Sequence, residues 1–456
     1  MNFKKKIASK KIWVLCAAFL AASGGALLWG AQKDKGNVIF ITLDALRADH
    51  MSCYGYPRNT TPHMDKLARE GALFTQAISV SSLTISSVPS IMTSTYPDAH
   101  RIREFGDLLD PSIISLGGAL KENGFFTGAI TAQLFPHLLF RGDFLSTKVQ
   151  LDAKADQMTD WAIEWLERHK NKRFFLWMHY FDPHGPYTPP APYDTMYLED
   201  KFYKKGEEVP LLDRKRGGFG GIPGYQAQRA SKDKNFYIAQ YDGEIRFADE
   251  QIGRLVKALE AKGLSRKTTI IISADHGESM GEHGYYFDHG ASLYDALVRV
   301  PLIIYHPAMK PLKRVIHQQV SLVDIMPTIL GITKAKPPRQ ARMEGADLMP
   351  LITHGKTYEN AYVFGEYFDG EAQQYALRSN EWKLIYEKKL GHYELYDLRK
   401  DPGEEKNVFG EDPEHSKMLA RQLNAFIERP MEKTDGKRTE LSEENQEKLR
   451  SLGYLN

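Results

Sequence analysis

Continuous apolar runs and helical repeats alternate along most of the chain. Four of the apolar runs are rich in β-branched or aromatic residues and are bounded by polar positions. They are "VIFITLD" (38–44), "FFLWMHY" (174–180), "TTIIISAD" (268–275) and "VPLIIYH" (300–306). Such runs are typical of strands that are buried on both faces of a sheet. The pattern therefore predicts four strands of one central sheet.

Between these runs, apolar residues recur at helical spacing. The segment "TTPHMDKLAREG" (60–71) predicts a helix that Thr61 caps. The ranges 158–166 and 241–259 show the same period, and Gly263 is placed to stop the second helix. Strands that alternate with helices predict an α/β fold, with a mainly parallel central sheet flanked by helices.

The pattern changes beyond about residue 335. The segments "YALRSNEWKLIYEKK" (375–389) and "HYELYDL" (392–398) are short and alternate in polarity, which predicts a hairpin of a small antiparallel sheet. The tail is strongly charged and predicts a peripheral helix or a disordered segment. The domain prediction is a catalytic domain at 37–334, a C-terminal subdomain at 335–428 and a charged tail at 429–456.

The N-terminal segment 1–36 combines a cluster of lysines with a long apolar run. Five lysines between Lys4 and Lys11 precede an uncharged run of twenty residues from Ile12 to Ala31. Such a run spans about 30 Å as a helix, enough to cross a bilayer. Small residues at 21–26 also fit a cleaved signal peptide. Either reading predicts export: a membrane-anchored protein that faces the periplasm or cell exterior, or a secreted one.

Composition narrows the expected partners and linkages. The chain has 456 residues, with 60 Lys and Arg against 58 Asp and Glu and a net charge of +2. This balance gives no reason to expect a nucleic-acid partner. Cys16 lies in the N-terminal apolar run, so Cys53 is the only cysteine in the rest of the chain. An intrachain disulfide is therefore not expected.

Polar residues follow the ends of the predicted strands. Asp44 and Asp275 each end an apolar run, and His184 follows another closely. In open α/β sheets, ligands bind beyond the carboxyl ends of the strands, so these residues predict a functional site. Residues 186–235, rich in Pro, Gly, Tyr and charge, predict a surface excursion near that site or a flexible insertion without function.

Four segments resemble a known family. They are "DALRADHMSCYGY" (44–56), "LTISSVPSIMTSTYPDAH" (83–100), "HYFDPHGPY" (179–187) and "SADHGESMGEHGYYFDHGASLYDALVRVPLII" (273–304). Their order and spacing resemble the sulfatase family of the alkaline-phosphatase superfamily. The resemblance implies an alkaline-phosphatase/sulfatase-like fold with a small C-terminal antiparallel sheet. It also implies a metal-dependent enzyme that cleaves sulfuric or phosphoric esters.

The resemblance also implies a site for one divalent metal ion. Asp44, Asp275 and His276 match the family's ligands, and Thr84 would be a further ligand. Two carboxylates and an imidazole leave positions open for a nucleophile and a substrate. Many sulfatases carry a second aspartate where this chain has Ala45. The mixed nitrogen and oxygen set favours Mn or Zn, while Ca and Mg stay open.

The nucleophile segment departs from the family's pattern. Sulfatases of the best-known type carry Cys or Ser, with Pro two residues on and Arg four residues on, and that residue is oxidised to formylglycine. Ser87 has Pro89 at the right distance. The spacing to the downstream part of the motif instead implies Thr84. Ser86 and Val88 then replace the family's Pro and Arg.

A threonine at this position changes the expected chemistry. Threonine cannot become formylglycine because its β-carbon carries a methyl group, and a sulfated threonine lacks the second hydroxyl that would expel sulfate. A phosphothreonine can be opened at phosphorus by water or an alcohol. The hypothesis is a hydrolase or phosphotransferase of phosphate or phosphonate esters with Thr84 as covalent nucleophile. Two alternatives are a sulfatase that acts without formylglycine and a non-catalytic binding protein on a sulfatase scaffold. For the segment itself, the alternative is a hydroxyl-rich helix start in which Thr84 only caps a helix.

Several histidines complete the predicted site. By resemblance, His184 contacts the ester oxygen or the leaving group. His289 stands where many sulfatases place a lysine and could donate a proton there. Either histidine could instead hold a loop by hydrogen bonds. His179 and His283 are weaker candidates, and Arg47 lies near the metal or forms an ordinary salt bridge. The expected partner is an anionic ester: a phosphorylated or sulfated small molecule, glycan or lipid head group.

Overall fold

The computed structural model describes most of the chain after the N-terminal segment. Residues Asn37–Asn456 form one compact unit. The predicted anchor or signal segment lies, apart from Gly36, outside the described residues. The described ranges are 36–214, 217–227, 230–307, 314–338, 342–355, 362–370, 372–430, 437–440, 442–444 and 446–447. Within them, no helix combines the length and the apolar character that a membrane crossing requires.

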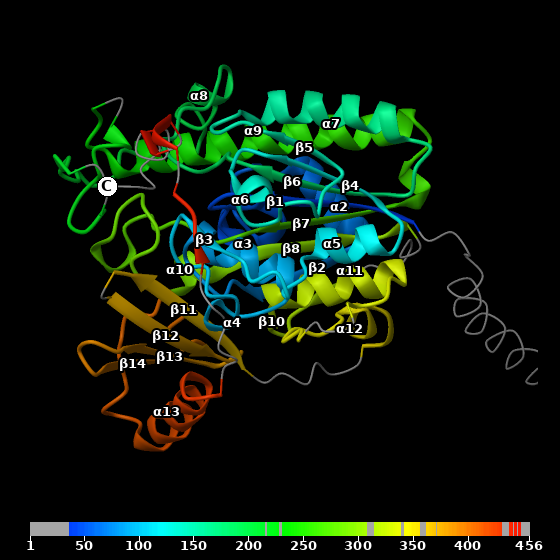
Figure 1. The fold of residues 1–456 in the computed structure, drawn as a ribbon. Coiled ribbons are helices and arrows are strands. Elements are labelled where there is room, and N and C mark those ends of the chain that lie inside the picture. Colours follow the sequence, from blue (N-terminus) through cyan, green and yellow to red (C-terminus); the bar gives the residue numbers. More distant parts are fainter. Residues whose placement is uncertain are drawn as a thin grey trace, which may run out of the picture. The chain divides into compact units, whose positions relative to one another are not determined.

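A mixed sheet lies at the centre of this unit (Figure 1). Its strands are β1 (Asn37–Leu43), β2 (Ala72–Ile78), β4 (Phe126–Thr131), β5 (Ser146–Val149), β6 (Phe174–Tyr180), β7 (Thr268–Ala274), β8 (Arg299–Tyr305), β9 (Arg314–Ile316) and β10 (Val320–Ser321). The order is β10-β2-β8-β7-β1-β6-β4-β5, and β9 also pairs with β2. Only β8 is antiparallel to its neighbours β7 and β2. The predicted mainly parallel sheet is therefore confirmed.

All four predicted strands are present in this sheet. Every residue of β1, β6 and β7 is buried, and so is every residue of β8 except Arg299. β1 lies between two parallel neighbours, and its Ile39 pairs with Leu176 on one side and Ile270 on the other. A strand in this position has no face toward water, which explains why its sequence is apolar without alternation.

Helices cover both faces of the sheet. They are α2 (Pro62–Glu70), α3 (Thr84–Thr93), α4 (Pro97–His100), α5 (Leu116–Glu122), α6 (Phe135–Leu138), α7 (Ala155–His169), α8 (Tyr193–Met196), α9 (Lys234–Ala261), α10 (Asp295–Val298), α11 (Ile325–Thr333) and α12 (Met349–His354). In Figure 1, α7 and α9 lie along one side of the sheet and α11 along the other. The predicted helices are confirmed as α2, α7 and α9. Gly263, predicted to stop α9, follows its end with a φ of 66°.

The start of α2 differs from the prediction in one detail. Thr61 occupies the N-cap position, but its side chain makes no capping hydrogen bond. Its Oγ1 donates to Asp65 Oδ1 at 2.7 Å instead. Asp249 of α9 supplies the cap, because its two carboxyl oxygens accept from the backbone N–H groups of His63 and Met64 at 3.0 and 2.8 Å. One side chain thus satisfies two N–H groups of the first turn.

The carboxyl ends of β1, β6 and β7 meet at one edge of the sheet. Asp44 directly follows β1, Asp275 directly follows β7, and His179 is the second-last residue of β6. The parallel register pairs Thr42 with His179 across the first two strands. Adjacent parallel strands therefore bring together polar residues that are far apart in the sequence.

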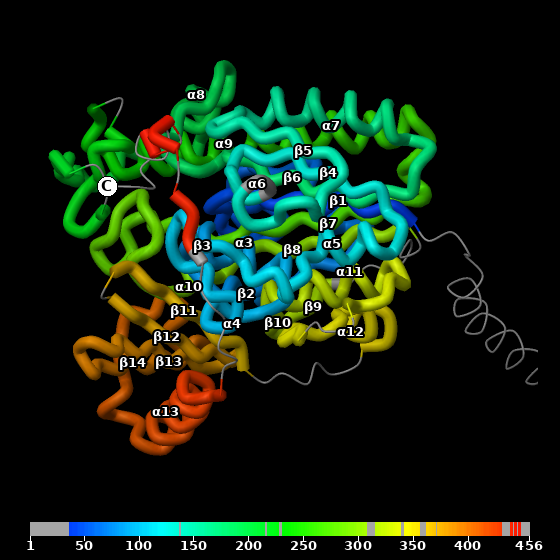
Figure 2. Tube along the Cα trace, viewed as in Figure 1, coloured from blue at the N-terminus to red at the C-terminus, as the bar shows by residue number. Residues whose placement is uncertain are grey.

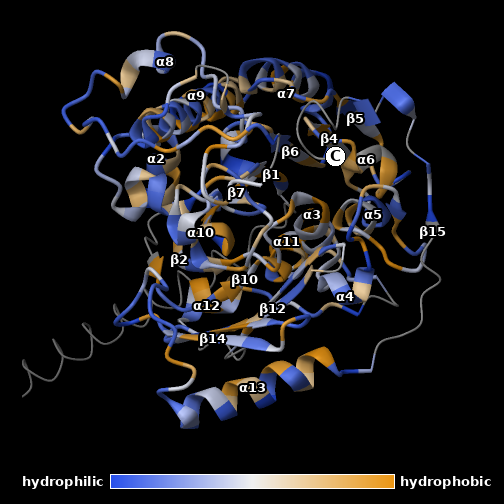
Figure 3. Ribbon diagram, turned by 90° about the vertical axis from the view of Figure 1, so that its left-hand side faces the viewer, coloured by the Kyte–Doolittle hydropathy of each residue, from blue (hydrophilic) through white to orange (hydrophobic). Residues whose placement is uncertain are grey.

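A second, smaller sheet is built from the C-terminal part of the chain. Its antiparallel strands are β11 (Val363–Asp369), β12 (Ala372–Arg378), β13 (Trp382–Glu387) and β14 (His392–Asp397), followed by α13 (Pro413–Ile427). β12 and β13 form the predicted hairpin. Figure 3 shows both hydrophobic and hydrophilic residues along α13. Its Leu419 and Leu423 pack against Leu377, Leu384 and Leu395 of the sheet.

The small sheet shares a core with the central part of the protein. Val363, Tyr367 and Ala376 belong to one cluster of buried residues with Ile78 and Leu297. This cluster fixes β11 and β12 against β2 and α10. The boundary proposed at 334/335 stays a prediction, since the two sheets are parts of one compact unit.

The charged tail contains a short strand, although its sequence predicts a peripheral helix or a disordered segment. β15 (Lys437–Arg438) pairs antiparallel with β3 (Asp107–Leu108), and Figure 2 shows the two segments side by side. Arg438 reinforces the pairing, because its Nε donates to Asp107 Oδ1 at 2.7 Å. The described end of the chain is therefore attached to the loop that follows α4.

Candidate active site

Thr84, the first residue of α3, faces the carboxyl ends of the central strands. Its Oγ1 lies 2.9 Å from His276 Nε2 and 3.4 Å from Asp44 Oδ1. Leu83, not Thr84, occupies the N-cap position of the helix. The alternative in which Thr84 only caps a helix is therefore wrong. The hydroxyl is directed toward a group of buried ionisable side chains instead.

Ser87 lies one turn further along α3 and has a different environment. It is completely buried. Its Oγ donates to the backbone carbonyl of Asp275 at 2.6 Å and lies 3.0 Å from Ser79 Oγ. Ser79 also donates to the same carbonyl, at 2.5 Å. The two serines therefore hold the backbone that carries Asp275.

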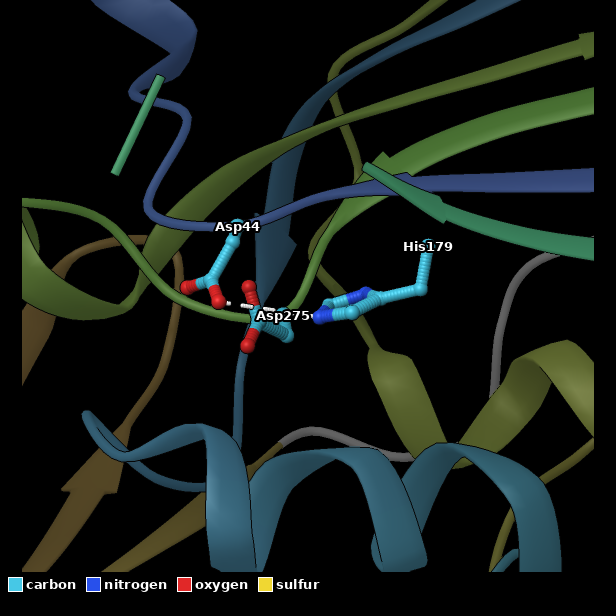
Figure 4. A group of neighbouring side chains, drawn as sticks. All are labelled: Asp44, His179 and Asp275. Atoms are coloured by element: carbon cyan, nitrogen blue, oxygen red, sulfur yellow. Dashed lines mark ion pairs between the residues drawn. The ribbon is translucent and has the colours of Figure 1, made fainter. Parts of the chain in front are cut away.

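Asp44, His179 and Asp275 form a group that could hold a metal ion (Figure 4). One ligand atom from each lies within 4.8 Å of the other two, and all three residues are buried. Within the described part of the chain, Asp275 Oδ2 and His179 Nε2 have no hydrogen-bond partner. Buried polar atoms in this state are costly unless a cation compensates them. These residues therefore fit a divalent metal.

His276 faces the same space as this group. Its Nε2 lies 3.5 Å from Asp44 Oδ1 and 3.6 Å from Asp275 Oδ2. Its Nδ1 donates to the carbonyl of Gly277 at 2.8 Å, which leaves the lone pair on Nε2. The three predicted ligands, Asp44, Asp275 and His276, thus converge with Thr84 in one place, and their ligation stays a prediction.

The orientation of His179 follows from its hydrogen bonds. Its Nδ1 lies 2.7 Å from Thr42 Oγ1, which accepts from Trp177 Nε1 at 3.1 Å and donates to the carbonyl of Met178 at 3.3 Å. If the hydroxyl proton goes to that carbonyl, Nδ1 carries the imidazole proton. The Nε2 lone pair then faces Asp44, whose Oδ2 is 3.6 Å away. His179 was only a weak candidate, and its signal was a polar residue inside an apolar buried strand.

The two buried aspartates, Asp44 and Asp275, have pKa shifts in opposite directions. Burial alone would raise the pKa of Asp44, but the nearby His184, His276 and His179 outweigh it and bring that pKa below its usual range. Burial raises the pKa of Asp275, and the neighbouring charge of Asp44 adds to this increase. Two carboxylates this close resist joint ionisation unless a cation lies between them.

A second group of side chains lies beside the first. His289 Nδ1 donates to Glu278 Oε1 at 3.2 Å, and Glu278 Oε2 accepts from Tyr187 at 3.0 Å. The ring centre of His289 is 4.4 Å from that of His276 and 4.9 Å from that of His184. A carboxylate at Nδ1 stabilises an imidazolium ion. Glu278 was not predicted, although it lies in the quoted "DHGESMGEHG" block.

The loop that carries His184 is anchored to α9. Lys154 Nζ lies 3.4 Å from Asp182 Oδ1 and 3.2 Å from Glu244 Oε1. Glu244 also accepts from the backbone N–H of Thr188 at 2.8 Å. Burial raises the pKa of Glu244 well above its ordinary value, and the charge of Asp182 adds to this increase. A buried network therefore fixes both sides of His184.

His283 and Arg47, two of the weaker candidates, make contacts that hold the structure together. His283 stacks on Tyr294 with ring centres 3.6 Å apart. Arg47 forms ion pairs of 2.7 Å with Asp49 and Glu282. Of the alternatives for Arg47, the ordinary salt bridge agrees with these contacts. Its Nη1 also donates to the carbonyl of Glu278 at 3.0 Å and so holds the loop behind His289.

An open pocket of about 500 Å³ extends from Thr84. His289 lines it beside Thr84. The remaining wall comes from the start of α3, the loop after α4, the excursion predicted at 186–235, the loop at 285–291 and the end of β11. Its lining includes Arg103, Phe105, Phe219, Tyr285 and Phe368. The prediction that the excursion lies near the site is therefore confirmed.

Comparison with known proteins identifies the family. The sulfatase profile matches residues 36–335, more than half of the chain. This chain belongs to the sulfatase family. A second profile, "N-sulphoglucosamine sulphohydrolase, C-terminal", matches residues 281–433. An arylsulfatase of Clostridium perfringens is 25% identical over 444 residues, which cover 83% of this chain and 91% of that protein.

Two solved structures share the fold of this sulfatase-family member. One was determined in complex with its substrate D-glucosamine-2-N,6-O-disulfate; it has a TM-score of 0.72 and 22% identity, and the match covers 91% of this chain and 98% of that chain. The other is a phosphonate monoester hydrolase from Silicibacter pomeroyi, with a TM-score of 0.71, 22% identity and coverages of 86% and 94%. The chain is thus an ester hydrolase with an alkaline-phosphatase/sulfatase-like fold, and sulfatase-family enzymes use a divalent metal.

Ala45 stands where the resemblance to sulfatases implies a second aspartate. The residue adopts a φ of 61°, and its backbone N–H donates to Asp275 Oδ1 at 3.3 Å. Gln133 donates to the other aspartate, Asp44 Oδ2, at 3.2 Å. Neutral donors therefore contact both carboxylates. Gln133 was also missed, because it follows β4, a strand that the sequence pattern did not mark, and an isolated Gln carries no distinctive signal.

Proposed function

We propose that this protein hydrolyses phosphate or phosphonate esters, or transfers their phosphoryl group, with Thr84 as the covalent nucleophile. The observation that carries the proposal is the position of Thr84 Oγ1, 2.9 Å from His276 Nε2 and 3.4 Å from Asp44 Oδ1. A hydroxyl at the start of a helix and beside buried metal-type ligands is placed to act as a nucleophile. Ser87 is less suitable because the backbone of Asp275 already holds its hydroxyl.

The identity of the nucleophile favours phosphorus over sulfur. A sulfated threonine cannot expel sulfate by breaking its carbon–oxygen bond, because it has no second hydroxyl on the β-carbon. A phosphothreonine can be cleaved at phosphorus instead. Water or an alcohol attacks phosphorus, the bond between phosphorus and Oγ1 breaks, and Thr84 recovers its proton. The likeness in fold to a phosphonate monoester hydrolase is compatible with this chemistry.

The metal proposal follows from the ligand set. Asp44, Asp275 and His276, with Thr84, would hold one divalent ion, and His179 adds a second imidazole beside them. Two carboxylates and up to two imidazoles favour Mn or Zn over the all-oxygen preference of Ca and Mg. When bound, such an ion lowers the pKa of the hydroxyl and neutralises charge on the ester oxygens.

The remaining steps belong to the chain's own residues. The first backbone N–H groups of α3 have no partner within the helix, so its N-terminus attracts the anionic ester. His289, held at Nδ1 by Glu278, can give an Nε2 proton to the departing alcohol when its imidazole is charged. His184 places its lone pair on Nε2, because Nδ1 donates to the carbonyl of Gly185 at 2.6 Å. It can therefore accept a hydrogen bond from the substrate or from the attacking water.

A sulfatase that acts without formylglycine is the second candidate. The family profile and the 25% identity to an arylsulfatase favour it. It would use the same metal ligands, but it requires another route for releasing sulfate. A non-catalytic binding protein is disfavoured because the buried carboxylates would be retained without a catalytic use.

We also propose that the enzyme is exported and acts outside the cytoplasm. The support is the sequence alone: clustered lysines before the uncharged run from Ile12 to Ala31. An exported enzyme of this class would meet phosphorylated or sulfated small molecules, glycans or lipid head groups.

The test compares ester classes on the full chain purified with Mn²⁺ or Zn²⁺. Aryl phosphate monoesters, diesters, phosphonates and sulfates are assayed with the wild type, Thr84→Ala and Ser87→Ala. We expect phosphorus esters to be preferred and Thr84→Ala to lower kcat by about 10⁴-fold or more. Ser87→Ala tests the other candidate hydroxyl of the same helix, and we expect a smaller loss because Ser87 only holds the backbone of Asp275. Preferred sulfate turnover that survives Thr84→Ala would contradict the proposal.

A further inference from the structure

Arg103 brings a positive charge to the open pocket. It lines the pocket together with Thr84 and His289. Its Nε is buried without a hydrogen-bond partner in the described part of the chain, and its guanidinium forms no ion pair with any described carboxylate. An arginine inside a protein wall is ordinarily paired. The guanidinium of Arg103 therefore has its binding capacity available for a ligand.

The fold holds this guanidinium in place without neutralising it. Its carbon Cζ lies 3.6 Å from the ring centre of Phe368, so the flat group stacks on the aromatic face. The backbone N–H groups of Arg103 and Glu104 both donate to Asp107 Oδ2, at 3.0 and 2.9 Å. Gly106 closes this turn with a φ of 102°. Because the side chain and its loop are already ordered, binding a ligand would cost little conformational entropy.

The acidic residues around the pocket are engaged elsewhere. Glu104 pairs with Arg438 of β15. The two oxygens of Asp288 accept from the backbone N–H groups of His289 and Gly217, at 3.0 and 2.7 Å. Asp369 accepts from Tyr367 at 3.3 Å. None of these carboxylates forms an ion pair with Arg103 among the described residues.

Glu366 is the buried acid whose charge Arg103 influences. Burial raises the pKa of Glu366 well above its ordinary value, and the charge of Asp98 adds to this increase. Both effects favour the neutral form of the Glu366 carboxyl group and outweigh the opposite effect of the Arg103 charge. The positive charge of Arg103 is available to a ligand in the pocket.

We propose that Arg103 binds a second oxyanion group of the substrate, carried on the alcohol part of the ester. This inference rests on the proposed function, because it places the scissile ester at Thr84 in the same pocket. A guanidinium offers parallel N–H donors that match a carboxylate, a sulfate or a phosphate. The preferred substrates are then esters with at least two anionic groups. Arg103 selects them, and it takes no part in the bond-breaking step.

The test uses matched substrates that differ in one charged group. Phenyl phosphate is compared with 3-carboxyphenyl and 3-sulfophenyl phosphate, on the full-length enzyme with its metal. We expect the wild type to prefer the charged esters by about 10- to 100-fold in kcat/KM, mainly through KM. Arg103→Gln should abolish this preference and leave phenyl phosphate within about threefold of the wild type. Arg103→Lys should restore part of it. The carboxyl and sulfo substrates show which oxyanion geometry fits better.

Arg101→Gln is the matched control, because it removes a neighbouring arginine that does not line the pocket. An equal loss toward all three substrates in Arg103→Gln, or a wild type without preference, would overturn the inference. If no phosphate ester is turned over, the proposed function fails separately. Calorimetric binding of the same three compounds to Thr84→Ala and to Thr84→Ala/Arg103→Gln then decides the role of Arg103: a selective loss of the charged ligands supports it, and equal binding refutes it.

Discussion

The metal-binding group and the open pocket meet at Thr84, but the fold holds their residues in different ways. Asp44, His179 and Asp275 are buried and belong to the ends of adjacent strands. The pocket wall comes from loops and from the end of β11, and Phe219 in it is 54% exposed. Rigid strand ends can place charges for one reaction, while loops can be exchanged to fit different substrates.

This difference predicts two classes of mutational effect. Changes in the metal-binding group should lower turnover of every substrate, because the group acts on the ester itself. Changes in the pocket should alter KM and depend on the alcohol part of the substrate.

Asp275→Asn is expected to have the largest effect. The substitution removes one charge from a proposed metal ligand, so kcat should fall by about 10³-fold or more for all ester classes. Bound metal, measured by atomic emission after dialysis, should fall in parallel. Asp412→Asn, at the N-cap of α13 and far from the site in sequence, is the control. Normal metal content with normal kcat would remove Asp275 from the metal site.

Glu278→Gln should have an intermediate effect that depends on the leaving group. The variant keeps a partner for His289 but loses the charge that stabilises its imidazolium. We expect kcat/KM to fall by about 10- to 100-fold for alkyl esters and much less for nitrophenyl esters, which leave without a proton. Glu282→Gln, in the same loop but paired with Arg47, is the matched control. Equal losses for both types of ester would contradict proton donation by His289.

Glu244→Gln tests the buried network that fixes the loop of His184. Folding raises the pKa of Glu244 above its ordinary value of 4.5, so the folded state keeps a proton that the unfolded state releases. Stability from this group is therefore lost as pH rises above about 4.5 and toward the raised pKa of the folded state. The free energy of unfolding is measured with urea from about pH 5 to about pH 8. It should decline less steeply with pH for the variant than for the wild type. Glu260→Gln, at an exposed position of α9, should leave the slope unchanged. Parallel curves for wild type and Glu244→Gln would contradict this pKa assignment.

Phe219→Ala should have the smallest effect. Its ring centre lies 4.6 Å from that of Tyr285 at the pocket. Loss of this aromatic surface should raise KM by about two- to tenfold for bulky esters and leave kcat unchanged. Phe202→Ala, also exposed and in the same excursion, does not line the pocket and is the control. A fall in kcat would instead show that the pocket wall supports the reacting groups.

The sequence predicted the parts of the fold that depend on local periodicity. The four apolar runs became β1, β6, β7 and β8, because strands without a wet face need continuous apolar sequence. The antiparallel direction of β8 could not be predicted, since strand direction depends on how a connection crosses the sheet. The cap of α2 was also missed, because Asp249 reaches it from a helix far along the chain.

The site residues also divide into those that the sequence marks and those that only the structure reveals. Asp44, Thr84, Asp275 and His276 could be selected because motif spacing marks them, and the fold brings them within hydrogen-bonding or ion-pair distance. His179 and Glu278 needed the structure, because their importance lies in neighbours supplied by other segments.

Trapping the phosphorylated enzyme shows whether Thr84 is the covalent nucleophile. The full-length enzyme, loaded with Mn²⁺ or Zn²⁺, is mixed with an aryl phosphate, quenched in acid within its first turnover and digested for mass spectrometry. The account predicts one phosphate on the peptide that contains Thr84, located on that side chain by fragmentation and absent from Thr84→Ala. Turnover with an unmodified Thr84, or with the phosphate on Ser87, would contradict it.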